Sequence, residues 1–139
     1  MRYADPNTDG AKINFKEKYD NFIGGQWVAP VKGEYFDNIS PVNGKPFAKV
    51  AKSSPEDIEL ALDAAHAAKT KWNAASPTER SNLLLKIADR LEQNIELLAV
   101  AETWENGKPI RETLAADIPL AIYYFGYFAD AIREQEVDI

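Results

Sequence analysis

Few side chains in this sequence could carry out covalent or acid–base chemistry. The 139 residues include no cysteine and one histidine, His66. A thiolate nucleophile, a disulfide and a multi-histidine metal site are therefore excluded within these residues. His66 lies at the margin of the apolar face of a predicted helix, among alanines, so we expect it to have a boundary or surface role. The sequence predicts no catalytic residue.

Two carboxylates that lie three residues apart, Glu102 and Glu105, stand near the end of another predicted helix. Such a pair can serve as general acid and base or can bind a cation. A solvated helix end explains the same spacing, and from spacing alone we favour that interpretation. The pair Gly24–Gly25 is not a phosphate-binding loop, because it lacks the G-x-G-x-x-G pattern and does not run from a strand into a helix. No cofactor-binding residue is predicted either.

Charge and hydropathy argue against two classes of partner. The chain has 16 Lys and Arg against 22 Asp and Glu, a net charge of −6, and no long basic run. Nucleic-acid binding is not expected, because neutralising phosphates requires clustered cations. The longest apolar stretch, residues 120–125, is far shorter than the roughly 20 residues of a transmembrane helix. We expect a cytoplasmic protein with no membrane partner and no nucleic-acid partner.

Strands and turns dominate the first part of the chain. Residues 1–19 are polar and predict an N-terminal arm. Two short β-prone runs flank Gly24–Gly25, which can adopt the positive φ angles of a tight hairpin turn. A second turn is predicted at Asn43–Gly44. Pro41 and Pro46 favour edge strands there, because proline has no backbone N–H for a ladder.

Three long helices are expected to follow, over residues 55–72, 77–106 and 111–134. The first two begin with a Ser-Pro pair followed by acidic residues, which is typical of a capped helix start. Pro119 predicts a kink in the third helix or a new start after Asp117. Short strands and hairpins followed by long helices give an α+β fold class.

The third helix is apolar or aromatic on every side between Leu120 and Ala129. A helix of this kind is normally surrounded by protein. Two other helices and a few edge strands do not suffice to surround it, so we expect missing neighbours. The chain by itself should expose apolar surface and should self-associate or bind a hydrophobic dye.

Six segments of the chain carry recognisable motifs: Phe22–Val28, Ser40–Gly44, Asp57–Ala68, Ser76–Arg80, Glu102–Pro109 and Tyr127–Ala129. In this order they resemble the N-terminal part of the NAD(P)-dependent aldehyde dehydrogenase superfamily. The most specific segment, Glu102–Pro109, is similar to the family's E-T-x-[DE]-N-G-K-P signature. The run around the Gly-Gly turn is most similar to bacterial enzymes that act on acetaldehyde and other short aldehydes.

This resemblance implies that residues 20–139 are the N-terminal portion of a longer subunit and an incomplete domain. The fold would then be part of the α/β aldehyde dehydrogenase fold. The catalytic cysteine, the residues that bind NAD or NADP and the hairpin that joins subunits into a homo-oligomer would all lie beyond residue 139. The whole enzyme would oxidise an aldehyde to a carboxylic acid through a cysteine thioester, and this chain by itself would be inactive.

The resemblance also implies two sites within the chain. A monovalent cation site would involve Asn38, Ile39 and Glu105, although Glu105 stands where the family usually has aspartate. The substrate entrance would be lined by Ala116 and Leu120, and both residues also suit an ordinary core. A different class of function stays open beside the enzyme: a stand-alone truncated helical module that inserts its aromatic helix into a partner.

Overall fold

The computed structural model describes residues 3–134. It divides the chain into two compact units. One unit is Phe15–Ala74, and the other holds the described parts of Met1–Asn14 and Ala75–Ile139. Residues 1–19, for which we predicted a polar arm, therefore contribute to both units. Within residues 3–134, no helix combines the length and the apolar character needed to cross a membrane.

A three-stranded sheet lies in the Phe15–Ala74 unit, in the order β1-β5-β4. Strand β1 (Lys18–Tyr19) runs parallel to β5 (Pro46–Ala51), and β4 (Tyr35–Ile39) runs antiparallel to β5. The expectation of an edge strand after Pro46 was therefore wrong, because β5 is the central strand. Pro46 is the first residue of β5, and β1 pairs only with Lys49 and Val50, so the missing N–H does not interrupt that pairing.

The predicted hairpin around Gly24–Gly25 is confirmed. Strands β2 (Asn21–Ile23) and β3 (Gln26–Val28) pair antiparallel across the two glycines, whose φ angles are +60° and +81°. These positive angles are the ones that a two-residue hairpin turn requires. The second predicted turn also forms, since Gly44 has a φ of +68° and donates its N–H to the Ser40 carbonyl.

Helix α1 (Pro55–Asn73) begins at a capped start, as predicted. The Ser54 N–H donates to the Asp57 carboxylate at 2.7 Å, and the Val31 N–H donates to the same carboxylate at 2.9 Å. These bonds hold the pKa of Asp57 below its ordinary value, with the Ser54 bond as the larger cause. Asp57 is 2% exposed, so this carboxylate is a buried link between the helix start and the loop after β3.

The predicted helix over residues 77–106 is two helices in the structure, α2 (Pro77–Gln93) and α3 (Ile95–Asn106). The break is at Asn94, which leaves the helical region with φ −118° and ψ +21°. Its side-chain amide donates to the Arg90 carbonyl at 2.8 Å, which satisfies one of the end carbonyls of α2. The apolar periodicity continues across this break, and for that reason the sequence pattern did not predict it.

The last helical stretch contains three elements: α4 (Ile110–Glu112), the π-helical turn η1 (Thr113–Asp117) and α5 (Ile118–Glu134). The predicted new start after Asp117 is confirmed, but a π-helical turn precedes it. The Ile118 N–H donates to the Thr113 carbonyl, five residues earlier, as in a π-helix. Pro119 has no backbone N–H, so the regular series of helix hydrogen bonds is also interrupted at the start of α5.

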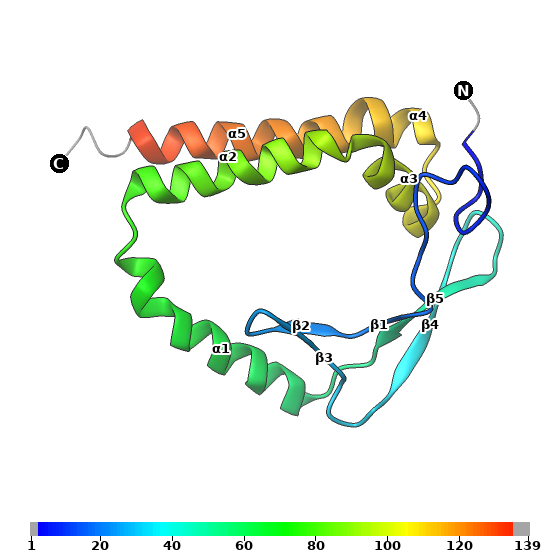
Figure 1. The fold of residues 1–139 in the computed structure, drawn as a ribbon, viewed down its shortest axis with the longest axis horizontal. Coiled ribbons are helices and arrows are strands. Elements are labelled where there is room, and N and C mark those ends of the chain that lie inside the picture. Colours follow the sequence, from blue (N-terminus) through cyan, green and yellow to red (C-terminus); the bar gives the residue numbers. More distant parts are fainter. Residues whose placement is uncertain (1–2, 135–139) are drawn as a thin grey trace. The chain divides into compact units, whose positions relative to one another are not determined.

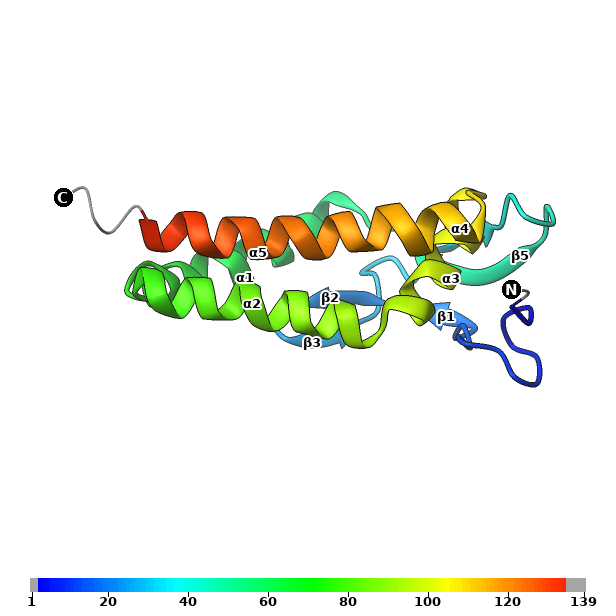
Figure 2. The same cartoon turned by 90° about the horizontal axis from the view of Figure 1, so that it is seen from above.

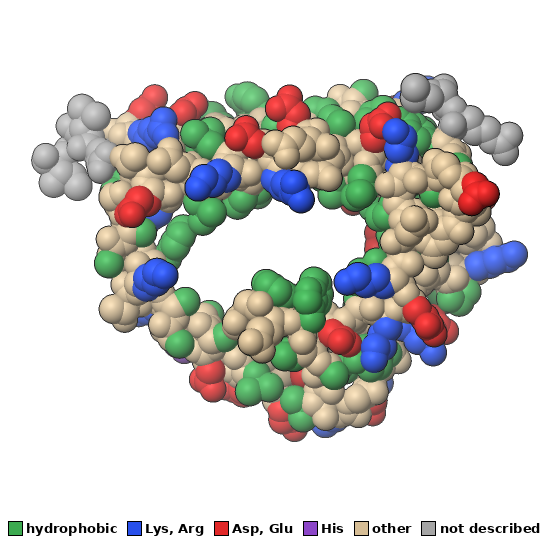
Figure 3. Space-filling model, in the orientation of Figure 1, with side chains coloured by type: hydrophobic (Ala, Val, Ile, Leu, Met, Phe, Trp, Pro, Cys, Tyr) green, Lys and Arg blue, Asp and Glu red, His purple; other side chains and the backbone are tan. Residues whose placement is uncertain are grey.

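Helices α2 and α5 lie side by side and pack along their length (Figures 1 and 2). Ala88 of α2 and Ala129 of α5 are buried. Helix α5 also exposes aromatic rings, including Tyr123 at 61% and Phe128 at 54% exposure. Hydrophobic side chains, drawn in green, also reach the surface of both units in Figure 3. The exposed apolar surface expected from the sequence is present.

Candidate functional site

The segment Glu102–Pro109 ends α3 in a network of local hydrogen bonds. Glu102 accepts from the Asn106 side-chain amide at 2.7 Å, and the Asn106 side chain accepts from the Lys108 N–H at 2.8 Å. Gly107 adopts a φ of +79°, which is the left-handed C-cap that glycine allows. These contacts agree with the interpretation of Glu102 as part of a helix end.

Two polar contacts connect the end of α3 to the π-helical turn η1. The buried Thr113 hydroxyl lies 2.9 Å from the Ala99 carbonyl and 3.0 Å from the Thr103 hydroxyl. Lys108 forms an ion pair with Asp117 at 2.8 Å, and this pairing raises the pKa of Lys108. Because both contacts join α3 and its C-terminal cap to η1, they fix the position of the start of α5 relative to α3.

The two residues predicted at the substrate entrance lie on this stretch. Ala116 is in η1 and Leu120 is in the first turn of α5, and both are exposed in the structure, Leu120 at 52%. Among the described residues, neither belongs to a core. The π-helical turn shifts the angle between Ala116 and Leu120 from that of a regular α-helix, because each of its turns contains more residues.

The residues predicted for the cation site belong to both units. Asn38 and Ile39 end β4, at a register shift, and Glu105 lies in the last turn of α3. Ile39 is opposite Pro46, which has no N–H to donate to it across the ladder. Residues 3–134 contain no cluster of three or more His, Asp or Glu side chains that could hold a metal ion. The predicted site depends on carbonyl and amide oxygens, so it stays a prediction.

His66 is exposed, in agreement with the predicted surface role. Among residues 3–134, the connection from a strand into a helix, from β5 to α1, contains no glycine.

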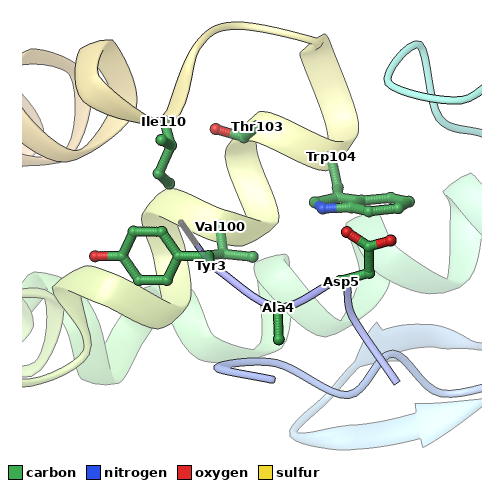
Figure 4. Close-up of a pocket in the computed structure, with 7 residues that line it drawn as sticks. All are labelled: Tyr3, Ala4, Asp5, Val100, Thr103, Trp104 and Ile110. Atoms are coloured by element: carbon green, nitrogen blue, oxygen red, sulfur yellow. The ribbon is translucent and has the colours of Figure 1, made fainter. Parts of the chain in front are cut away.

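A cavity of about 260 Å³ lies between residues 3–13, hereafter the N-terminal loop, and α3 (Figure 4). Sequence reasoning did not find it, because the polar composition of residues 1–19 predicted an arm and indicated no contact with α3. Glu96 of α3 binds the loop at two points, accepting from the Tyr3 hydroxyl at 3.1 Å and pairing with Lys12. The lining residues are Tyr3, Ala4, Asp5, Val100, Thr103, Trp104 and Ile110.

Comparison with known proteins identifies the family. The sequence model of the aldehyde dehydrogenase family matches residues 27–139, and the chain belongs to this family. A long-chain-aldehyde dehydrogenase from Acinetobacter sp. is 74% identical over 136 residues, which is 98% of this chain and 27% of that protein. An acetaldehyde dehydrogenase from Pseudomonas aeruginosa is 63% identical over the same shares of the two chains.

Solved structures agree with this assignment. An indole-3-acetaldehyde dehydrogenase in complex with NAD⁺ is similar with a TM-score of 0.82 and 37% identity, over 87% of this chain and 25% of that one. The chain therefore has part of the aldehyde dehydrogenase fold, as predicted. It spans about a quarter of the length of the relatives that it matches.

Proposed function

We propose that this chain is the N-terminal portion of a longer subunit that oxidises aldehydes to carboxylic acids with NAD⁺ or NADP⁺. The observation that carries this proposal is the combination of 74% identity over 98% of the chain with coverage of only 27% of the relative. The reaction would proceed through a cysteine thioester. Since the chain has no cysteine, the nucleophile must come from elsewhere in the subunit.

The role of the chain in that subunit is to provide part of the scaffold. Its exposed aromatic residues on α5 support a further partner within the same subunit, because apolar faces of this kind are normally covered. The remainder of the subunit would cover them. In line with the family resemblance, the subunit would assemble as a homo-oligomer in the cytoplasm.

The substrate would be an apolar aldehyde that passes Ala116 and Leu120. Neither side chain carries a polar group, and both are exposed on the described surface, as an entrance lining requires. Acetaldehyde and other short aldehydes are the first substrates to test. The Acinetobacter relative is named for long-chain aldehydes, so the test needs a series of chain lengths.

A monovalent cation would bind the Ile39 carbonyl and Glu105, with Asn38 beside them. Oxygen atoms of these types are the ligands that hard cations prefer.

The intact mass of the natural gene product tests the proposal of a longer subunit. We expect a subunit several times heavier than the 15.5 kDa of this chain. A natural product of 15.5 kDa would contradict it. That result would favour the alternative of a stand-alone helical module that inserts its aromatic helix into a partner. No comparison supports this alternative.

A further inference from the structure

We propose that the cavity under the N-terminal loop binds a small primary ammonium ion with an apolar body. The cationic group would lie at the Asp5 carboxylate, against the indole of Trp104. The apolar body would contact Val100 and Ile110. All four residues line the same cavity (Figure 4).

The loop that supplies Asp5 is held in place at several points. Glu96 binds Tyr3 and Lys12, near the two ends of the loop. Within the loop, the Asn7 N–H donates to the Ile13 carbonyl at 3.3 Å, and the Thr8 hydroxyl donates to the Asp5 carbonyl at 2.6 Å. These bonds position Asp5 before any ligand arrives, which lowers the ordering cost of binding.

Asp5 is the only charged residue among the described residues that line the cavity. The two hydroxyl groups of the lining already have hydrogen-bond partners. The Tyr3 hydroxyl donates to Glu96, and the Thr103 hydroxyl bonds with Thr113. The charge that a ligand meets inside the cavity is therefore negative, which favours a cation over a neutral or anionic molecule.

The position of Trp104 also favours a cationic ligand. In Figure 4 the Asp5 carboxylate is directed toward the indole ring of Trp104. The face of an aromatic ring carries a partial negative charge, so a carboxylate directed at it is electrostatically unfavourable. An ammonium group at this place pairs with the carboxylate and is attracted by the ring at the same time.

The size of the cavity limits the ligand. A volume of about 260 Å³ holds roughly eight or nine water-sized groups at about 30 Å³ each. Benzylammonium has a body of this size and a primary cationic group, so it is a suitable probe. Benzyl alcohol has the same shape without the charge.

The test is a titration of the full-length protein, labelled with 5-fluorotryptophan, with benzylammonium chloride and ¹⁹F NMR as the readout. The Trp104 resonance is assigned by its loss in Trp104→Phe. We expect a saturable shift of that resonance with benzylammonium and none with benzyl alcohol. Asp5→Asn should weaken binding about two- to fivefold, because Asp5 is itself exposed and exposed ion pairs are weak.

Asp9→Asn is the matched control, because it removes the same charge from an exposed position of the same loop, outside the cavity lining. It should leave the dissociation constant unchanged. An equal response to benzyl alcohol, an equal loss of binding in both Asn variants, or no saturable shift of Trp104 would each overturn the proposal. Unchanged resonances of the other tryptophans show that Asp5→Asn remains folded.

Discussion

The hydroxyl groups of Thr103 and Thr113 lie 3.0 Å apart and join the last turn of α3 to the π-helical turn η1. Thr113 is fully buried, and its hydroxyl is also 2.9 Å from the Ala99 carbonyl. A hydroxyl has one proton, so the distances are consistent with Thr113 donating to Ala99 and accepting from Thr103. This chain of bonds connects the E-T-W-E-N-G-K-P segment to the helix that carries Leu120.

Thr113→Val should destabilise this connection. Valine keeps the shape, but it removes the donor of the buried bond to the Ala99 carbonyl and the partner of the half-buried Thr103 hydroxyl, which costs about 1–3 kcal/mol. Hydrogen exchange of the α3 amides measures the free energy of local opening. Thr113→Ser keeps the hydroxyl and loses one methyl group, so it should cost about 1 kcal/mol. Equal protection in Thr113→Val and the unmodified protein would contradict the role of the hydroxyl.

Docking of the N-terminal loop should depend on pH through Glu96. The hydrogen bonds from Lys12, first, and Tyr3 lower the pKa of this carboxyl. The stabilisation of the docked loop by the Glu96 carboxylate is therefore fully present above the ordinary glutamate pKa of about 4.3. It is lost as the pH falls through the lowered pKa that Glu96 has in the folded protein. Pairing raises the pKa of Lys12, which stays charged throughout this range.

Hydrogen exchange of the loop amides tests the pH dependence. After correction for intrinsic rates, protection should fall about two- to fivefold on acidification, because exposed ion pairs are weak. Glu96→Gln still accepts from Tyr3 but has no charge, so its lower protection should not change with pH in this range. Parallel profiles for the two proteins would show that another group is responsible.

The aromatic face of α5 should make the isolated 139-residue chain bind a hydrophobic dye or self-associate. Tyr123, Tyr127 and Phe128 are each more than half exposed. Replacing all three by serine should lower dye fluorescence, whereas replacing the exposed Lys69 and Lys71 of α1 should not. A compact monomer that does not bind the dye, seen by sedimentation, would count against an apolar face that requires covering.

Leu120→Trp should change substrate ranking in the full-length enzyme. If Leu120 lines the entrance, the larger side chain should raise KM for bulky aldehydes about tenfold more than for acetaldehyde. Ala115→Trp is the matched control, because Ala115 is exposed in the preceding turn, η1, and is not predicted at the entrance. An unchanged ranking with a lowered melting temperature would assign Leu120 to the core instead, since overpacking destabilises without changing specificity.

Local signals in the sequence predicted much of the fold. The Gly-Gly hairpin, the capped starts of α1 and α2 and the C-cap at Gly107 all form, because each depends on residues adjacent in the chain. The break at Asn94 and the central position of β5 were not predicted. The first interrupts a continuous apolar pattern, and the second depends on pairing with β1, far away in the sequence.

The sites were harder to predict from the sequence than the fold was. The cavity at Trp104 requires the N-terminal loop to fold back on α3, and Glu96 binds Tyr3 and Lys12 of that loop from more than 80 residues away in the sequence. No local pattern marks such a pairing. The residues predicted for the cation site and for the substrate entrance came from the family resemblance. The oxygen atoms of the first set and the apolar side chains of the second are compatible with these roles but do not specify them.

The measurement that tests the central claim most directly is aldehyde-dependent formation of NADH or NADPH, followed by absorbance. It compares the full-length protein with the highly purified 139-residue chain, each with acetaldehyde and a series of longer aldehydes. We predict turnover by the full-length protein and none by the 139-residue chain, which has no thiol to attack the carbonyl. Turnover by the 139-residue chain, or a folded full-length protein that oxidises none of these aldehydes, would contradict the account.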